Sequence, residues 1–474
     1  MNNIAIIVKY NNLDDEVIYE GKPSFQIVEE KVKEIGLPYY IFSSIDNKNF
    51  IKFDGTVNSL LKQIDFNVKS FNNILFFNSD MPLYDINLVK KMLKEHEENL
   101  SDFTLSENYP EGFSPFILNR ASFKKLLLIS TGNNSIYSYN SIKSLIELDI
   151  NSYDVEIISP DIDMRFIKET FSTKNKRGYI LTKSLLEKNV TSSNLLDKIR
   201  ENPNLLRPLP IYITIELSSY CNQKCIFCPY SKIKKDKLFS HNLEKLINEI
   251  SIWTEECFIE FSGIGEPFLY PEFDKVIKII MEKTNINFII ETNGTLIEKY
   301  IEKLGEIKNL TLIISINADN KQDYKNIHGS DDFDIVETNI ERAIKNNINT
   351  YLQFVRCKDT EQYLEGFIKR WDFIKDKIIL KKYNDFCFME DKKVVDLAPL
   401  NRFPCWKLQR NLYISSDYYL SPCYQDIKNS IGIDLSKKTI QEAWEELNNL
   451  YKKHWENSHP DICKNCDEWY IFDM

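Results

Sequence analysis

The sequence predicts an α/β protein of three units: an N-terminal α/β domain, a partial barrel of six strand-and-helix pairs, and a small C-terminal unit that contains four cysteines. Three observations support this expectation. The chain has 474 residues, more than the roughly 100–200 residues of a usual domain. Short apolar runs alternate with helical patterns along two separate stretches. All ten cysteines occur from residue 221 onward, in two groups and three single positions.

Residues 1–195 form the first expected domain. The apolar runs "IAIIVKY", "PYYIFSS" and "NILFFNS" are typical of buried strands, and "FQIVEEKVKEI" and "INLVKKMLKEH" have the apolar spacing of helices. Such alternation favours a Rossmann-like layer of largely parallel strands. The charged, Asn-rich stretch at 195–210 carries three prolines and is expected to be a linker.

Residues 208–398 repeat the pattern with six strand-like runs. These are expected at 211–217, 257–261, 287–291, 310–316, 350–355 and 377–382. The segments between them place apolar residues at helical spacing, as in the stretch from Leu243 to Ile250. A repeated strand, loop and helix indicates a partial (β/α)6 barrel of the TIM type, whose chemistry belongs at the carboxyl ends of the strands.

Residues 399–474 have a different pattern. Short strand-like pieces precede one helical segment, "TIQEAWEELNNLYKKHW". Four cysteines lie here, with Cys405 and Cys423 followed by a CxxC pair, Cys463 and Cys466. Four thiolates can close a metal site, so we expect a small metal-stapled α+β domain.

Composition excludes several classes of function. With 43% hydrophobic and 27% charged residues, the chain is expected to fold throughout. A net charge of -10 without a dense Lys/Arg cluster argues against binding a nucleic-acid polymer. No stretch has the ~18 apolar residues of a membrane span, and the N-terminus has no secretory signal, so we expect a cytoplasmic protein without membrane contact. In the reducing cytosol, spaced cysteines indicate metal binding rather than disulfides.

The stretch "CNQKCIFC" follows directly on the first expected barrel strand. Zinc would need a fourth ligand, whereas a cubane cluster held by three cysteines leaves one iron open, so this spacing indicates a metal or iron–sulfur site. The CxxxCxxC spacing of Cys221, Cys225 and Cys228, with Phe227 before the last cysteine, resembles the cluster loop of radical S-adenosylmethionine (SAM) enzymes. The resemblance implies a [4Fe–4S] cluster whose open iron binds the methionine part of SAM.

Four further segments resemble motifs of the same family. They are "FSGIGEPFLYP", "ETNGTL", "SINAD" and "QFVRCKDTEQ", each after an expected barrel strand. The resemblance implies that Gly263 and Gly265 allow close backbone approach and that Glu266 receives the methionine ammonium. It places further SAM contacts at Thr292, Asn293, Ser315 and Gln353. Asn317 stands where the family more usually has an acid.

The same resemblance implies the chemistry. A reduced cluster passes one electron to SAM, the carbon–sulfur bond breaks homolytically, and a 5′-deoxyadenosyl radical removes hydrogen from a substrate. A small redox protein of the flavodoxin or ferredoxin type is the expected electron donor. The substrate stays unidentified, as either a peptide or protein or a sugar- or nucleotide-linked molecule.

The C-terminal segments "CWKLQRNLYISSDYYLSPCYQD", "IQEAW" and "CKNC" resemble the SPASM or shortened twitch extension of these enzymes. The resemblance implies a second [4Fe–4S] cluster on Cys405, Cys423, Cys463 and Cys466, with a zinc site on the same four cysteines as the alternative. Tyr418 stands where the longer pattern has Gly. The single cysteines are expected to be small buried residues, at Cys257, Cys357 and Cys387. No histidine shows metal-like spacing, and none is assigned a role.

In the N-terminal domain, "ILFFNSDMPLYDINLVKKML" and "GKPSFQIVEEKVKE" resemble the nucleotidyltransferase-like fold of sugar-nucleotide enzymes. The resemblance implies that Asp80 helps to hold a divalent metal and leaves Lys22 as a phosphate contact. The early loop carries acids that would repel a triphosphate, at Asp14, Asp15, Glu16 and Glu20. The domain is therefore expected to be degenerate, and the order of the three domains resembles spiro-SPASM proteins.

Three functions are compatible with these features. The first is a radical SAM enzyme that acts on an unidentified substrate. The second is a non-radical binding protein stapled by zinc or by an iron–sulfur cluster, and the third is a nucleotidyltransferase with a radical SAM domain attached. Metal analysis separates the first two, because two cubanes bring about eight irons per chain and a zinc-stapled adaptor brings none.

Overall fold

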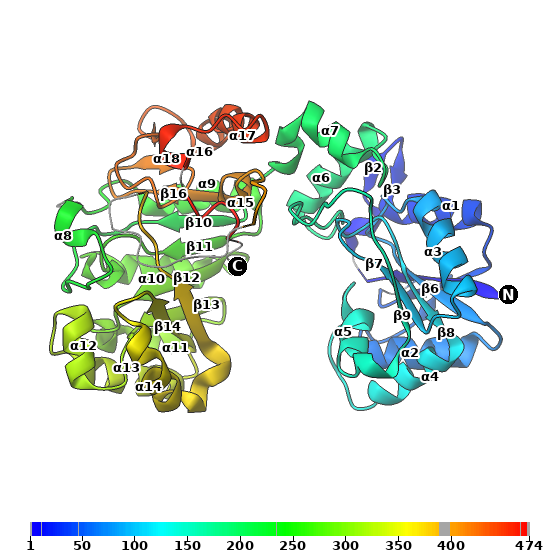
Figure 1. Cartoon of the computed structure of the whole chain (residues 1–474), viewed down its shortest axis with the longest axis horizontal. Coiled ribbons are helices and arrows are strands. Elements are labelled where there is room, and N and C mark those ends of the chain that lie inside the picture. The colour runs from blue at the N-terminus through cyan, green and yellow to red at the C-terminus, as the bar shows by residue number, and fades with distance from the viewer. Residues whose placement is uncertain are drawn as a thin grey trace. The chain divides into compact units, whose positions relative to one another are not determined.

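The computed structural model describes residues 2–10, 12–45, 47–233, 235–387, 399–464 and 466–471 (Figure 1). These residues form two compact units, unit 1 (Met1–Pro208) and unit 2 (Leu209–Met474). Each unit has a large sheet of its own. The domain boundary expected near residue 398 falls outside the described residues.

Unit 1 is built on a seven-stranded sheet in the order β5-β4-β1-β6-β8-β7-β9. Its strands are β1 (Asn3–Lys9), β4 (Tyr39–Ser43), β5 (Ile51–Lys52), β6 (Asn73–Asn78), β7 (Phe103–Ser106), β8 (Phe116–Asn119) and β9 (Val155–Ile158). The central pairs β1–β4 and β1–β6 are parallel, whereas β8 runs antiparallel to β6 and makes the sheet mixed. A small ribbon of β2 (Val17–Tyr19) and β3 (Lys22–Pro23) lies outside this sheet. The parallel centre agrees with the predicted Rossmann-like layer.

The helices of unit 1 each bury a set of apolar residues. They are α1 (Ser24–Ile35), α2 (Val57–Asn67), α3 (Ile86–Glu98), α4 (Arg120–Ile129), α5 (Ser141–Glu147), α6 (Lys176–Glu187) and α7 (Leu195–Glu201). One core cluster joins Ile6 of β1 to Leu60 of α2 and Leu126 of α4. The stretch expected to be a linker contains α7 and the 3₁₀ helix η3 (Pro203–Leu206), because Leu195 and Ile199 are buried, and the break between units follows Pro208.

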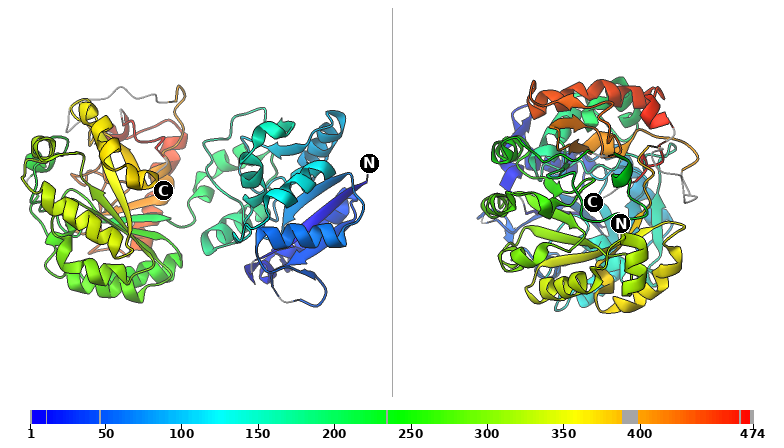
Figure 2. Two further views of the ribbon diagram at one scale, coloured as in Figure 1. Left: turned by 90° about the horizontal axis from the view of Figure 1, so that it is seen from below. Right: turned by 90° about the vertical axis from the view of Figure 1, so that its left-hand side faces the viewer.

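Unit 2 contains the predicted half-barrel. Its parallel strands are β10 (Tyr212–Ile215), β11 (Phe258–Phe261), β12 (Asn287–Thr292), β13 (Leu310–Ser315), β14 (Asn349–Arg356) and β15 (Ile378–Lys382). The helices between them are α8 (Tyr230–Ile233), α9 (Leu243–Thr254), α10 (Phe273–Glu282), α11 (Ile301–Gly305), α12 (Lys321–His328), α13 (Phe333–Lys345) and α14 (Leu364–Arg370). The helices from α9 to α14 cover one side of the curved sheet, whereas α8 lies in the loop that follows β10 (Figure 2). All six strands predicted from the sequence are confirmed.

Residues along the barrel strands alternate between two surroundings. In β11, Ile259 and Phe261 are fully buried, whereas Glu260 between them is only half-buried. In β12, Ile290 is fully buried and Glu291 is half-buried. Because successive strand residues point to opposite faces, the apolar set packs under the helices and the polar set lines the inner face.

The C-terminal segment extends the same sheet. Its strands are β16 (Asn411–Ile414), β17 (Tyr419–Ser421) and β18 (Ile433–Asp434), and its helices are α15 (Trp406–Arg410), α16 (Ile440–Glu446), α17 (Asn448–Trp455) and α18 (Asp461–Lys464). β16 pairs in parallel with β10, with Ile414 opposite Ile215. The one helix predicted at 439–455 is two helices, and α16 begins at a capping box formed by Thr439 and Glu442.

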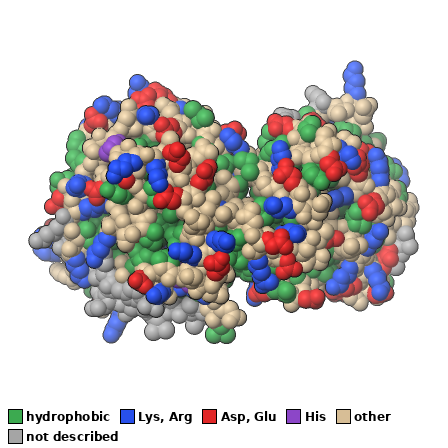
Figure 3. Space-filling view, turned by 90° about the horizontal axis from the view of Figure 1, so that it is seen from above, with side chains coloured by type: hydrophobic (Ala, Val, Ile, Leu, Met, Phe, Trp, Pro, Cys, Tyr) green, Lys and Arg blue, Asp and Glu red, His purple; other side chains and the backbone are tan. Residues whose placement is uncertain are grey.

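Charged side chains of both signs are interspersed over the face shown in Figure 3. Ion pairs at helical spacing among the described residues include Lys91 with Glu95 and Lys278 with Glu282. In the described part of the chain, no helix has the length and apolar content that crossing a membrane requires.

Candidate functional site

The cysteine loop, residues 221–228, leaves the carboxyl end of β10 and is fixed by α12. The N–H groups of Lys224 and Ile226 donate to two carbonyls at the end of α12, at 3.0 and 2.9 Å. The buried side-chain amide of Gln223, the residue before Lys224, donates to the Tyr324 hydroxyl at 2.6 Å. A helix distant in sequence therefore sets the position of the cysteines.

The thiols of Cys221, Cys225 and Cys228 lie close to one another. The Cys228 N–H donates to the Cys225 carbonyl at 3.1 Å. Burial, followed by the charges of Cys228 and Cys221, raises the pKa of Cys225 well above its usual value. Burial also raises the pKa of Cys221 to about 11. Buried thiols that oppose one another's ionisation must release protons when a metal binds.

Two rings flank the cysteine loop. Phe227 packs against Val355 and Tyr383, and its ring meets the His328 ring edge-on at 6.2 Å between centroids. His328 Nδ1 lies 3.2 Å from Cys225 Sγ, and its Nε2 lies 2.8 Å from a backbone carbonyl. Burial lowers the pKa of His328 to about 4. The sequence assigned no role to His328, yet it lies against an expected cluster ligand.

The glycine loop, residues 262–266, is packed directly on the backbone that leads into the cysteine loop. The Glu266 N–H donates to the Tyr220 carbonyl at 2.7 Å. A Cβ on Gly265 would lie 2.3 and 2.4 Å from two backbone carbonyls, and one on Gly263 would lie 2.8 Å from Glu216 Cγ. At both glycines the backbone therefore lies close to another part of the chain. This packing places Glu266 beside the cysteines.

The Glu266 carboxylate is buried and accepts three hydrogen bonds. Thr292 Oγ1 and the Phe268 N–H donate to Oε1 at 2.7 and 3.1 Å, and the Asn293 N–H donates to Oε2 at 2.8 Å. Burial raises the pKa of Glu266 to about 7, although these donors oppose the shift. A carboxylate has about four acceptor positions, so among the described contacts one position on Oε2 remains for a ligand cation.

The turn after β12 bonds to the cysteine loop. Asn293 Nδ2 donates to Asn222 Oδ1 at 2.7 Å, and Asn222 Nδ2 donates to Thr295 Oγ1 at 2.8 Å. Burial dominates the raised pKa of Cys221, the charge of Glu266 adds to it, and the Asn293 side chain opposes it. Cys221, Glu266 and Asn293 therefore lie together at the carboxyl end of the barrel.

Two other expected SAM contacts have partners within the chain. The Ser315 hydroxyl accepts from Asn317 Nδ2 at 2.9 Å, and Gln353 Nε2 donates to Glu291 at 2.7 Å. Asn317 is fully buried and accepts from the Val355 N–H, so it joins the ends of β13 and β14. Ser315 and Gln353 stay predictions as SAM contacts.

The C-terminal cysteine group comes from three separate segments. Cys405 precedes α15, Cys423 follows β17, and Cys463 and Cys466 lie in and after α18. Burial and then Cys466 raise the pKa of Cys405 to about 11, and burial and then the other three cysteines raise that of Cys423. Arg402 donates to the carbonyls of Cys463 and the next residue at 2.7 and 2.9 Å. The structure brings all four expected ligands together.

A fifth cysteine lies against this group. The Cys387 thiol is hydrogen-bonded to Cys466, and the bond lowers the pKa of Cys466 while it raises that of Cys387. The charges of Cys423 and Cys463 raise the Cys387 pKa further. The prediction of a small buried residue is therefore wrong for Cys387, which is half-buried and faces other thiols. Cys257 and Cys357 are buried, as predicted.

The donor sets fit iron–sulfur chemistry. Thiolates are the ligands that such clusters require, and both groups consist of thiols that lie within range of one another's charge. Among the described residues, no three His, Cys, Asp or Glu side chains are arranged as ligands of a single metal ion. In a cubane each cysteine sulfur binds a different iron. The cysteine sulfurs therefore lie farther apart than the ligands of a single metal ion.

Glu216, which sequence reasoning missed, ties the site together. It is fully buried and accepts from the Ile264 N–H at 3.1 Å, the Ser416 N–H at 3.0 Å and Lys235 Nζ at 3.2 Å. Burial opposes its ionisation, but Lys235 and the Ser416 donors lower the pKa of Glu216 overall. It joins the glycine loop, the C-terminal segment and the stretch after the cysteines. A charged residue inside the apolar run "IYITIEL" was the signal for it.

In unit 1 the residues expected to bind metal and phosphate are held by other side chains. Asp80 is fully buried, and its Oδ2 accepts from the Tyr10 and Ser172 hydroxyls at 3.0 and 2.6 Å. Burial raises the pKa of Asp80. Lys22 pairs with Glu30 at 2.7 Å. Asp80 Oδ1 is buried without a hydrogen-bond partner among the described residues, and the degenerate character of the domain stays a prediction.

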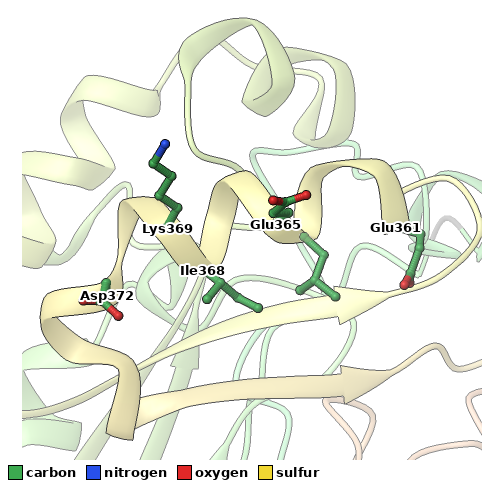
Figure 4. Close-up of a pocket in the computed structure, with 6 residues that line it drawn as sticks. Glu361, Glu365, Ile368, Lys369 and Asp372 are labelled. Carbon is green, nitrogen blue, oxygen red and sulfur yellow. The ribbon is translucent and has the colours of Figure 1, made fainter.

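An open hollow lies on the outer side of unit 2 (Figure 4). Its lining comes from η6 (Glu361–Tyr363), α14 and η7 (Asp372–Lys377), and consists of Glu361, Leu364, Glu365, Ile368, Lys369 and Asp372. Figure 4 shows the charged side chains spread along these helices rather than converging. No expected site residue lines this hollow. The candidate site described above, at the cysteine and glycine loops, is separate from it.

Residues 215–370 match the family model described as Radical SAM superfamily. The match runs from the end of β10 to the end of α14 and so includes the cysteine loop, the glycine loop and the turn after β12. This segment is a radical SAM domain, which indicates an enzyme of the radical SAM type. Enzymes of this family use a [4Fe–4S] cluster together with SAM.

Several curated proteins resemble the chain. An uncharacterized protein of Treponema pallidum is 25% identical over 362 residues, which cover 71% of this chain and 99% of that protein. The GTP 3′,8-cyclase of Aliarcobacter butzleri is 25% identical over 182 residues, 37% of this chain and 55% of the cyclase. The chain thus spans about half the length of that cyclase.

Solved structures also resemble the chain. Streptococcus suis SuiB bound to precursor peptide SuiA is 14% identical and aligns with a TM-score of 0.46 over 77% of this chain and 93% of that one. The anSMEcpe protein with bound AdoMet is 18% identical, with a TM-score of 0.42 over 52% of this chain and 81% of that one.

Proposed function

We propose that the chain cleaves SAM reductively and uses the resulting radical to remove hydrogen from a substrate. The observation that carries this proposal is the convergence of Cys221, Cys225 and Cys228 in a loop to which Glu266 and Asn293 are bonded. Three thiolates would hold three irons of a [4Fe–4S] cluster, and the fourth iron is left for SAM.

The cluster and SAM supply one-electron chemistry that yields a 5′-deoxyadenosyl radical, and the protein positions the reactants. Glu266 has one acceptor position open for the methionine ammonium, and Thr292 and Asn293 hold that carboxylate in place. Phe227 shields the cluster side, and Ser315 and Gln353 stand on the inner face, where the rest of SAM would lie.

We also propose a second [4Fe–4S] cluster on Cys405, Cys423, Cys463 and Cys466. Four protein thiolates complete its ligand set, so it serves electron transfer or staples the C-terminal segment instead of binding substrate. A small redox protein of the flavodoxin or ferredoxin type supplies the electron for SAM cleavage. Unit 1, with its enclosed Asp80, contributes to substrate binding or assembly.

The test is the formation of 5′-deoxyadenosine. Full-length protein, reconstituted anaerobically with iron and sulfide, should release it from SAM in the presence of dithionite. A Cys221→Ala/Cys225→Ala/Cys228→Ala variant should release none. Absence of the product from the wild type, or its persistence in the triple variant, would overturn the proposal.

A further inference from the structure

The inner face of the barrel holds three charged residues that the proposed function leaves unused. Glu260 of β11, Glu291 of β12 and Lys381 of β15 belong to the polar, inward-facing set of their strands. Two of them keep contact with solvent, because the Lys381 side chain is 36% exposed and that of Glu291 is 19% exposed. Glu260, the third, is half-buried.

Glu291 and Lys381 neutralise each other. Lys381 Nζ lies 2.9 Å from both carboxylate oxygens of Glu291, which also accepts from Gln353 at 2.7 Å and from Ser262 at 3.4 Å. Burial opposes both charges, but Lys381 lowers the pKa of Glu291 and Glu291 raises that of Lys381. This pair adds no net charge to the inner face.

Glu260 has no cation of its own. It accepts from Thr214 Oγ1 at 2.8 Å and is hydrogen-bonded to Tyr212, but it forms no ion pair within the described residues. Burial, and then the charge of Glu291, raises the pKa of Glu260 to about 7, and the charge of Lys381 opposes this shift. Two carboxylates share one ammonium, so ionisation of Glu260 leaves a negative charge that a bound cation would stabilise.

The location of this cluster matches a substrate site. Glu291 directly precedes Thr292, whose hydroxyl bonds to Glu266, and the charge of Glu291 reaches Glu266. On the other side, Lys382, the residue after Lys381, donates to the carbonyl of Asp467, the residue after Cys466, at 3.1 Å. The cluster therefore lies between the proposed SAM pocket and the C-terminal cysteine group.

We propose that Glu260, supported by the Glu291–Lys381 pair, binds a protonated amine of the substrate inside the barrel. The inference rests on the proposed function, since it assigns the substrate contact of the same site. A lysine side chain and an amino sugar share this chemistry. A nucleoside triphosphate does not, because its phosphates would meet the uncompensated charge of Glu260.

The test compares matched probes that differ only in charge. Anaerobically reconstituted full-length protein with SAM is titrated calorimetrically with glucosamine or N-acetylglucosamine, and with Nα-acetyl-lysine amide or its Nε-acetylated form. Each amine should bind at least about tenfold tighter than its acetylated partner, because a charge-assisted hydrogen bond is lost on acetylation. The amine that binds more tightly shows whether the amino group of the substrate belongs to a peptide or to a sugar. Equal binding within each pair, or no binding of any probe, would overturn the inference.

Variants assign the effect to Glu260. Glu260→Gln keeps the size of the side chain and should reduce the preference for amines about tenfold, whereas Glu244→Gln, on the exposed first turn of α9, should not. Iron content and melting temperature show whether each variant folds and loads. A Glu260→Gln protein with unchanged preference would overturn the assignment, and should this variant fail to load, the wild-type probe pairs still decide. Formation of 5′-deoxyadenosine is measured separately, so failure of this inference is distinguishable from failure of the proposed function.

Discussion

The two cysteine groups of unit 2 differ in how the chain builds them. The first lies within eight residues of one loop, and bonds to α12 fix its backbone. The second joins Cys405, Cys423 and the CxxC pair from three segments, and Cys387 adds a fourth. The first group is local and one thiol short of a full ligand set, whereas the second is non-local and has one thiol more than a cubane needs.

This difference indicates a division of roles. A cluster with an incomplete protein ligand set can bind a cosubstrate, and one with a complete set can pass electrons or hold segments together. The surroundings of each group agree with these roles. The first group adjoins the Glu266 carboxylate, which has an acceptor position left for a ligand. The second adjoins the buried ion pair of Lys407 and Glu468, at 3.1 Å, and the Arg402 bonds to the CxxC loop.

The largest expected effects come from removing each group entirely. The Cys221→Ala/Cys225→Ala/Cys228→Ala variant should lose about four of about eight irons and all SAM cleavage. Alanine at Cys405, Cys423, Cys463 and Cys466 should also lose about four irons but keep SAM cleavage with dithionite, because the first cluster keeps its ligands. Iron analysis and chromatography of 5′-deoxyadenosine measure both results. If the second group holds zinc in place of iron, the comparison of two iron–sulfur clusters no longer applies.

The next effect concerns the contact between the glycine loop and the cysteine loop. Gly265→Ala should reduce SAM cleavage about 100-fold or more, because its Cβ would lie 2.3 Å from a backbone oxygen and must displace Glu266 from the cysteines. Gly366→Ala is the matched control, since its Cβ would meet only the end of the Asp319 side chain. Initial rates decide the outcome, and similar rates in the two variants would show that the packing of these loops is unimportant.

A smaller effect is expected from the charge of Glu266 alone. Glu266→Gln keeps the shape of the side chain but replaces a charge-assisted hydrogen bond by a neutral one, so SAM should bind about 10- to 100-fold more weakly. Equilibrium binding of SAM to the reconstituted protein measures this change. Glu272→Gln, at an exposed helix start, should bind SAM like the wild type. Unchanged affinity of the Glu266 variant would remove the ammonium contact from the proposal.

The sequence predicted the barrel and the position of the cysteine loop for a physical reason. Strand and helix periodicity is a short-range signal, and the six strands of the half-barrel are each followed by a loop at one end of the sheet. Cys221, Cys225 and Cys228 are close in space because they are close in sequence. The close backbone approach at Gly263 and Gly265 was implied by the resemblance of their loop to the family motif, and the short distances that a Cβ would have there agree with it.

Long-range contacts were not predictable from such patterns. His328 reaches Cys225 from the end of α12, and Glu216 reaches Ser416 across 200 positions. Acids at the inner positions of "ITIEL", "FIEF" and "FIIET" were visible in the sequence, but strand register was needed to show that Glu260 and Glu291 share one face. The contact of Cys387 with Cys466 was also not predictable, because the two residues are far apart in the sequence.

The smallest expected effect tests this fifth thiol. Cys387→Ala alone should keep about eight irons, since the four other cysteines complete the second cluster. Cys466→Ala should also keep them, because the Cys387 thiol lies against Cys466 and can take over its iron. Only the double variant should fall to about four irons, and its loss should appear as a missing second signal in electron paramagnetic resonance of the reduced protein. Cys357→Ala, a buried thiol outside the group, is the control. If Cys466→Ala loses as much iron as the double variant, Cys387 is a neighbour of the cluster and not a reserve ligand, and the second group is then as strictly specified as the first.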